Sequence, residues 1–105
     1  FYKLCKENNM LFLQAHPFRP MITRTNPKYL DGCEVFNGKG AGTDINEKAE
    51  AWAEENNMKI RVAGTDFHRE SHIPNMTGIL TNEKIRTNDD LLRILRSGEF
   101  ELIKP

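Results

Sequence analysis

The sequence predicts an α/β fold in which consecutive strand–helix units build a mostly parallel sheet. Residues 10–15 form a nearly continuous apolar run, which is typical of a strand covered on both faces. The β-branched run at 59–63 is stopped by Gly64, as in a strand that meets a tight turn. A helix with a regular apolar stripe lies between the strand expected at 33–36 and the strand at 59–63. A strand, a helix and a second apolar strand form a βαβ unit, and the long crossover in such a unit makes its two strands parallel.

The composition is typical of a small globular protein. The chain has 105 residues, and its 15 Lys and Arg are balanced by 15 Asp and Glu. It therefore lacks the basic excess that usually accompanies nucleic-acid binding. Because there is no membrane-length apolar run and no signal-peptide pattern, we expect a cytoplasmic protein without a membrane partner. Cys5 and Cys33 are expected to be buried free thiols rather than a disulfide.

The first elements are a helix, a strand and a long loop. Residues 1–9 have apolar side chains at helical spacing from the start and no N-terminal capping residue, so the helix is expected to be entered part-way. The strand at 10–15 must end at His16-Pro17, because proline cannot donate to a central ladder. The proline-containing loop over 18–28 is long enough to be functional.

The central elements are a strand, a glycine-rich loop and a helix. The strand at 33–36 runs into the loop at 37–42, whose glycine spacing matches neither a P-loop nor a dinucleotide fingerprint. We interpret this loop as a mobile strand-to-helix connection. The helix begins at a cap, Thr43 or Asp44, and ends at the asparagine pair 56–57. Its core-facing residues are expected to be Ile45, Ala49, Trp52 and Ala53.

The last part of the chain contains a polar loop, two strands and a helix. The loop covers 69–75, and we interpret its His72 as a surface histidine. A short strand is expected at 76–81 and a final one at 100–103. The helix between them is capped by Thr87 or Asn88 and ends at Gly98.

Polar side chains follow three of the expected strands. His16 follows the first, Glu34 or Asn37 belongs to the second, and Asp66 with His68 follows the third. The carboxyl ends of parallel strands meet at one edge of a sheet, where ligand sites are commonly built. Carboxylate oxygens and neutral imidazoles are good ligands for Zn²⁺, Mn²⁺ or Fe²⁺. The sequence thus suggests a metal site at this edge, although ordinary hydrogen-bonded residues remain an alternative for each position.

Three segments stand in a fixed order along the chain: AHPFR at 15–19, DGCEVFN at 31–37 and GTDFH at 64–68. In this order they resemble the later motifs of the polymerase-and-histidinol-phosphatase (PHP) superfamily. Residues 87–103 are also similar to the closing helix and strand of its small phosphoesterase members. The resemblance implies part of a distorted, TIM-barrel-like (βα)7 barrel. It also implies a cluster of up to three divalent metal ions (Zn, Mn or Fe) at the carboxyl ends of the strands.

The resemblance assigns roles to individual residues. It implies His16, Asp66 and His68 as metal ligands, with Asp66 and His68 as the catalytic residues. Glu34 matches a recurrent position in the substrate pocket. Arg19 and Arg69 flank the ligand motifs, and their planar guanidinium groups suit a substrate phosphate, unless they are solvated loop charges.

The chain lacks the family's first motif, a His-x-His pair, and the ligands of the strands that follow it. A catalytic metal needs about three protein ligands and an open position for water. We therefore expect residues 1–105 to be the C-terminal portion of a single PHP-like domain without its N-terminal half, inactive in isolation. In the full-length parent, the resemblance implies hydrolysis of a small phosphorylated substrate by metal-activated water.

Three alternatives stay open at the level of the sequence. The parent is a nucleic-acid or nucleotide phosphodiesterase or exonuclease, a reading that the balanced charge does not favour. Alternatively, it is a non-catalytic metal-binding or scaffold module. Finally, a partial barrel exposes unpaired sheet edges, through which this chain is expected to self-associate.

Overall fold

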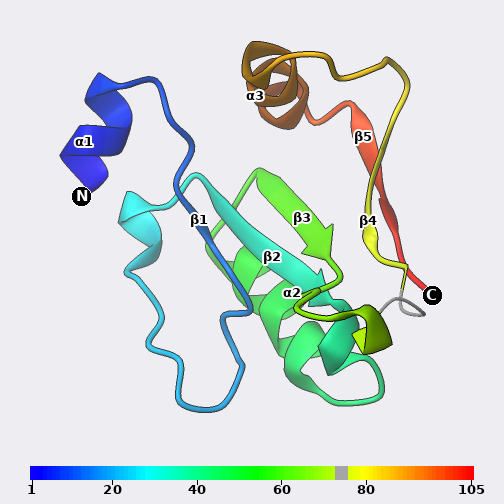
Figure 1. Cartoon of the computed structure of the whole chain (residues 1–105). Helices are drawn as coiled ribbons and strands as arrows, with labels where there is room; N and C mark the ends of the chain where they lie inside the picture. The colour runs from blue at the N-terminus through cyan, green and yellow to red at the C-terminus, as the bar shows by residue number, and fades with distance from the viewer. Residues whose placement is uncertain (73–75) are drawn as a thin grey trace.

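Three parallel strands form the main sheet of the computed structural model, which describes residues 1–72 and 76–105 (Figure 1). The strand order is β1-β2-β3, with β1 at Leu13–Gln14, β2 at Gly32–Asn37 and β3 at Ile60–Gly64. Both neighbouring pairs run parallel. The parallel arrangement predicted for these three strands is therefore confirmed.

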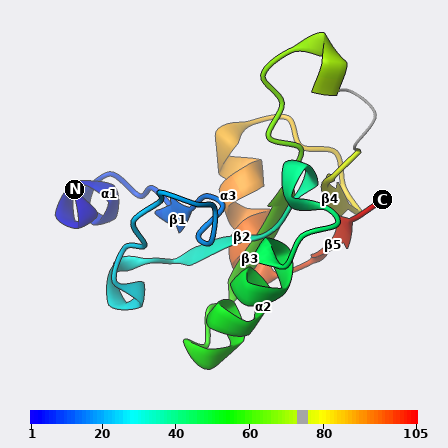
Figure 2. The same cartoon turned by 90° about the horizontal axis from the view of Figure 1, so that it is seen from below.

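Helix α2, at Ile45–Glu55, connects β2 to β3 and packs against β2 (Figure 2). Cys33 and Val35, two residues apart on β2, are fully buried. They form the core together with Ala53 of α2 and Met58, which follows that helix. The predicted βαβ unit is thus observed, and burial of its apolar side chains is the main force that holds α2 on the sheet.

The glycine-rich loop at 37–42 contains a 3-10 turn, Gly38–Gly40, directly after β2. Asp44, one of the two expected caps, occupies the N-cap position of α2, but its side chain makes no capping hydrogen bond. The hydroxyl of Thr43 accepts a hydrogen bond of 3.4 Å from the backbone amide of Ile45. The loop therefore leads from the end of β2 into the helix through ordered local hydrogen bonds.

The N-terminal helix α1 spans Tyr2–Glu7, as expected, but the strand predicted at 10–15 is only two residues long. The backbone amide of Phe12 donates to the carboxylate of Asp31 over 2.8 Å. The amide of Asp31 in turn donates to the carbonyl of Phe12 over 2.9 Å. These two bonds satisfy the backbone amide and carbonyl of Phe12. The ladder between β1 and β2 therefore begins at Leu13, and the predicted strand was too long.

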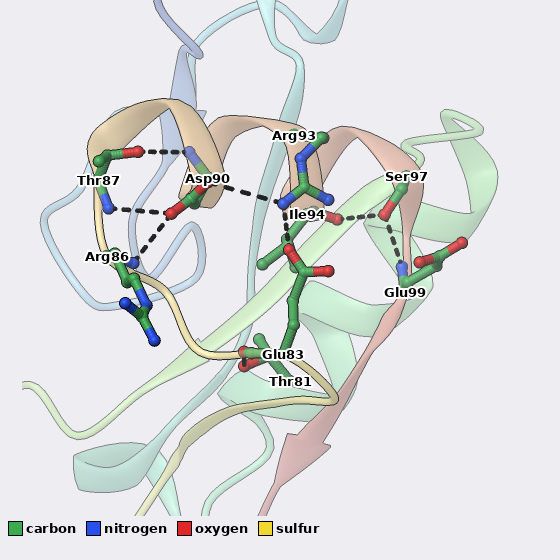
Figure 3. Close-up of polar contacts among 9 residues, drawn as sticks. All are labelled: Thr81, Glu83, Arg86, Thr87, Asp90, Arg93, Ile94, Ser97 and Glu99. Atoms are coloured by element: carbon green, nitrogen blue, oxygen red, sulfur yellow. Dashed lines mark hydrogen bonds and ion pairs between the residues drawn. The ribbon is translucent and has the colours of Figure 1, made fainter.

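Helix α3, at Asn88–Ser97, has the strongest end signals of the molecule (Figure 3). The Thr87 hydroxyl accepts from the amide of Asp90, and the Asp90 carboxylate accepts from the amide of Thr87. This reciprocal pair is a capping box. Gly98 ends the helix in the left-handed conformation, with φ of 75°. Both predicted ends are confirmed.

The two C-terminal strands form a second, antiparallel sheet. The chain runs along β4, at Gly78–Thr81, and then forms α3. It returns antiparallel to β4 along β5, at Phe100–Ile103 (Figure 1). Leu102 packs against the main core, and β4 lies near β3. The parallel order thus ends at β3, and the strands of the described residues form two separate sheets rather than a closed barrel.

Both cysteines are buried free thiols, as predicted. Burial raises the pKa of the Cys33 thiol to about 11, although the charge of Arg61 opposes this shift. Within the described part of the chain, no helix combines the length and the apolar character needed to cross a membrane.

Candidate functional site

The carboxyl ends of β1, β2 and β3 are joined by a chain of side-chain hydrogen bonds. The backbone amide of His16, just after β1, donates to the Oε2 of Glu34 on β2 over 2.8 Å. The side-chain amide of Asn37, at the end of β2, donates to the same Glu34 oxygen over 3.1 Å. It also donates to the Oδ2 of Asp66, past the end of β3, over 3.2 Å. The polar groups that follow the three strands therefore lie at one edge of the sheet.

Asn37 is the centre of this network, and only 4% of its surface is exposed. Its Oδ1 accepts from the backbone amide of Lys39 over 2.9 Å, which fixes the amide so that its nitrogen faces the two carboxylates. The side chain of Asn46 on α2 holds the backbone of Asn37 on both sides. Its oxygen accepts from the Asn37 amide over 2.8 Å, and its nitrogen donates to the Asn37 carbonyl over 3.1 Å.

Asp66 is an enclosed charged group of the site, with 6% of its side chain exposed. An Arg19 nitrogen lies 3.1 Å from its Oδ2. The Nδ1 of His68 lies 3.2 Å from its Oδ1 and 2.9 Å from its backbone carbonyl oxygen. The His68 side chain is itself 65% exposed. Asp66 thus sits between a guanidinium group, an amide and an imidazole that faces solvent.

These neighbours keep the Asp66 carboxyl ionised. Burial taken alone raises its pKa and is the largest single influence. The hydrogen bond from Asn37 and the charge of Arg19 lower the pKa, with further contributions from Lys39 and His68. Together they outweigh burial, so the pKa of Asp66 lies below its usual range.

The loop that follows β1 is fixed by aromatic packing, and this determines where Arg19 lies. The backbone amide of Arg19 donates to the carbonyl of His16 over 3.1 Å. The neighbouring ring of Phe18 packs edge-on against Trp52 of α2, with 6.1 Å between ring centroids. The Arg24 guanidinium lies over the same Phe18 ring, 4.3 Å from its centroid. The loop is therefore anchored on α2 next to the residue that pairs with Asp66.

The backbone adopts uncommon conformations at two of the predicted residues. His16 has φ of 25° and Asp66 has φ of 57°, values that few residues other than glycine adopt. At Gly64, a Cβ atom would lie 2.8 Å from the Oε1 of Glu34, so this glycine leaves room for the carboxylate. Such positions cluster at functional sites because the surrounding structure has to stabilise them.

The donor types at this edge suit a divalent metal ion, but their arrangement does not form a metal site. In favour of binding, the Nδ1 of His16 is buried and has no hydrogen-bond partner among the described residues. Against it, no three His, Cys, Asp or Glu side chains of the described residues are grouped so that they could hold a metal ion. The Oδ2 of Asp66 is already engaged by Arg19 and Asn37. The present arrangement of these residues therefore does not fit a metal ion.

The other predicted site residues have different surroundings. The carboxylate of Glu34 lies inside the network, where it bridges the amides of His16 and Asn37. Arg69 is exposed in the loop after His68. The interpretation of the His72 side chain and of residues 73–75 lies outside the part of the chain that the structure describes.

Two residues of this edge were not assigned a role from the sequence. Asn37 was only an alternative to Glu34, and the signal that points to it is its position at the carboxyl end of a parallel strand, where ligand sites are commonly built. Lys39, whose positive charge lowers the pKa of Asp66, lies in the glycine-rich loop that we interpreted as a strand-to-helix connection.

No family model matches the chain, and it matches neither a curated protein nor a solved structure. Membership of the PHP superfamily therefore stays a prediction from the sequence.

Proposed function

We propose that this chain is the C-terminal part of a PHP-type, metal-dependent phosphoesterase domain, a distorted (βα)7 barrel that hydrolyses small phosphorylated substrates. The observation that best supports the proposal is the hydrogen-bonded edge that joins His16, Glu34, Asn37 and Asp66 from three parallel strands. In α/β proteins this edge is the usual place for a ligand site. The enclosed, ionised carboxylate of Asp66 adds a group whose pKa is shifted by specific neighbours, as at many active sites.

In this proposal His16, Asp66 and His68 contribute part of a metal site, and the remaining ligands come from other parts of the parent domain. The described residues alone do not group three donors, so such a contribution is required for metal binding. Zinc, manganese or iron would supply a Lewis acid for the phosphate ester. Arg19 and Arg69 would pair with the oxygens of a substrate phosphate, because a guanidinium group matches their geometry.

The test compares the 105-residue chain with a longer form of the parent that includes the preceding residues. Both are incubated with an aryl phosphate and added Zn²⁺ or Mn²⁺. We expect no turnover by the short chain and clear turnover by the long one. In the long form, Asp66→Asn should abolish turnover, whereas Glu7→Gln, the control at an exposed carboxylate of α1, should leave it unchanged. Robust turnover by the short chain, or full activity of the Asp66→Asn variant, would refute the proposal.

One observation favours a second function, a non-catalytic module. The Oδ2 of Asp66 has two nitrogen partners, Arg19 and Asn37, which is an arrangement expected of a structural ion pair. In that case the longer protein should show no phosphatase activity with any of the metals, and Asp66→Asn should reduce its stability.

A further inference from the structure

Asn37-Gly38 is the one Asn-Gly pair in the sequence, and it lies where β2 ends and the glycine-rich loop begins. Such a pair rearranges readily in a flexible chain, because glycine has no side chain to hinder the approach of its backbone nitrogen to the asparagine. The Gly38 nitrogen attacks Cγ of Asn37, and the new N–Cγ bond closes a cyclic imide. The Cγ–Nδ2 bond breaks with its electron pair on Nδ2, which leaves as ammonia with the proton of the Gly38 amide. Water then opens the imide to aspartate or isoaspartate.

The backbone of the folded chain prevents this ring from closing. Closure needs the Gly38 nitrogen beside Cβ of Asn37, with the dihedral angle that relates these two atoms about the Cα–C bond near zero. Asn37 is extended, with ψ of 128°, and in an L-residue this value turns the next nitrogen away from Cβ. The Asn46 side chain holds the backbone in this conformation, because it accepts from the Asn37 amide over 2.8 Å and donates to the Asn37 carbonyl over 3.1 Å.

The side-chain amide of Asn37 is held as firmly as its backbone. Nδ2, the leaving nitrogen, donates to Glu34 over 3.1 Å and to Asp66 over 3.2 Å. Oδ1 accepts from the backbone amide of Lys39 over 2.9 Å. Both Asn37 and Gly38 are buried, which also limits the access of water. All of these contacts have to open before the side chain can reach the Gly38 nitrogen.

We propose that Asn37-Gly38 is a deamidation site that the fold closes and that opens when the end of β2 separates from its neighbours. The product returns poorly to the native structure. Aspartate at position 37 places a third carboxyl group between Glu34 and Asp66. Isoaspartate lengthens the main chain by one carbon and breaks the register that pairs Asn37 with Gly64. Deamidation therefore converts a reversible opening into an irreversible loss of structure, and it requires only water.

The experiment compares the 105-residue chain in buffer with the same chain unfolded in guanidinium chloride, at one mildly alkaline pH and one temperature. Cleavage after lysine and arginine releases residues 29–39, in which Asn37 is the only asparagine. The mass of this peptide reports the exchange of the amide for a carboxyl group. Residues 49–59, released by the same cleavage, carry the exposed pair Asn56-Asn57 and serve as the internal control.

We expect position 37 to deamidate at least about a hundredfold more slowly in the folded chain than in the unfolded one, because the reaction waits for a rare opening. The difference for residues 49–59 should be much smaller. Asn46→Ala, which removes the hold on the Asn37 backbone, should speed the reaction of the folded chain about tenfold. Asn56→Ala is the matched control, since it removes a hydrogen bond to the Trp52 carbonyl at the exposed end of the same helix, and it should change the rate by less than about threefold.

The comparison of the unmodified folded and unfolded chains decides the proposal even if Asn46→Ala does not fold. Equal rates at position 37 in the two states would overturn it, and so would the absence of a mass change there in the unfolded chain. A sample deamidated while unfolded is then returned to neutral buffer. Its native circular dichroism signal should recover only in proportion to the fraction of intact Asn37, and full recovery of a completely deamidated sample would overturn the irreversible loss.

Discussion

Replacing Asn37 with aspartate should make the stability of this protein strongly dependent on pH. The side-chain nitrogen of Asn37 lies 3.1 Å from the Oε2 of Glu34 and 3.2 Å from the Oδ2 of Asp66. Asn37→Asp keeps the size and shape of the side chain but replaces this shared donor with an oxygen. Three carboxyl groups then meet in a site where the central residue is almost fully buried.

The distances determine the size of the effect. At about 3 Å and an effective dielectric constant of about 20, each pair of like charges costs about 5 kcal/mol. The protein avoids this repulsion by keeping a proton on the introduced carboxyl, which costs about 4 kcal/mol near neutral pH for a group with an unfolded pKa of about 3.9. The protonated form donates to only one of the two carboxylates, so a further loss of about 1.5 kcal/mol is expected.

The pKa of the introduced carboxyl is thus raised in the folded state above its unfolded value. The folded chain then binds more protons than the unfolded chain, and the free energy of unfolding falls as the pH rises through the window from about 4 to the raised pKa. Relative to the unmodified protein, we expect a deficit in the free energy of unfolding of about 1.5 kcal/mol near pH 4 and about 5.5 kcal/mol near pH 7.

Urea unfolding, followed by circular dichroism at several pH values, measures this deficit. Asn37→Ala is the control, because it removes the same hydrogen bonds without adding a carboxyl group. Its deficit should grow less with pH than that of Asn37→Asp, since loss of the Asn37 hydrogen bond raises the pKa of Asp66 but places no third carboxylate in the site. A deficit for Asn37→Asp that is the same at both ends of the pH range would refute the reasoning. It would mean that the two carboxylates do not lie beside residue 37 in solution.

Four further predictions concern other parts of the chain. Gly32→Ala should lower the free energy of unfolding by about 3 kcal/mol in urea titrations, because its Cβ would lie 1.8 Å from the carbonyl oxygen of Ile60 on β3. Thr87→Ala should cost about 1 kcal/mol through loss of the α3 cap. Hydrogen bonds from the backbone of Arg86 and Thr87 lower the pKa of Asp90, so the stabilisation by its carboxylate is present near neutral pH and is lost as the pH falls through that lowered pKa. The Cys33 thiol, with its pKa of about 11, should react with a disulfide reagent near pH 8 much more slowly in the folded chain than in urea.

The elements that the sequence predicted best are those with strong local signals. Helix α3 has a capping box at its start and a glycine at its end, and both were readable from the residues. The βαβ unit around α2 followed from the periodicity and from the length of the crossover. The pattern of apolar residues does not encode strand direction, however, and for that reason the antiparallel pairing of β4 with β5 was not foreseen.

The candidate site was predictable only in its location. Topology alone places His16, Glu34 and Asp66 at one edge, because the ends of parallel strands meet there. The pairing of Arg19 with Asp66 joins residues 47 positions apart in the sequence, and it depends on the anchoring of the first loop by Phe18. Nothing in the local pattern around either residue indicates that pairing.

The sheet register explains why Asp66, two residues beyond β3, reaches Asn37. In the ladder Asn37 lies opposite Gly64, so an extended continuation of β3 would carry residue 66 about 6.6 Å past Asn37 along the strand direction. The left-handed backbone at Asp66, with φ of 57°, turns the chain at this residue, and its carboxylate meets the Asn37 amide. Asparagine tolerates this backbone conformation as well as aspartate does. Asp66→Asn is therefore the variant that removes the charge while keeping the turn, and any loss of metal binding or activity that it causes reports on the charge itself.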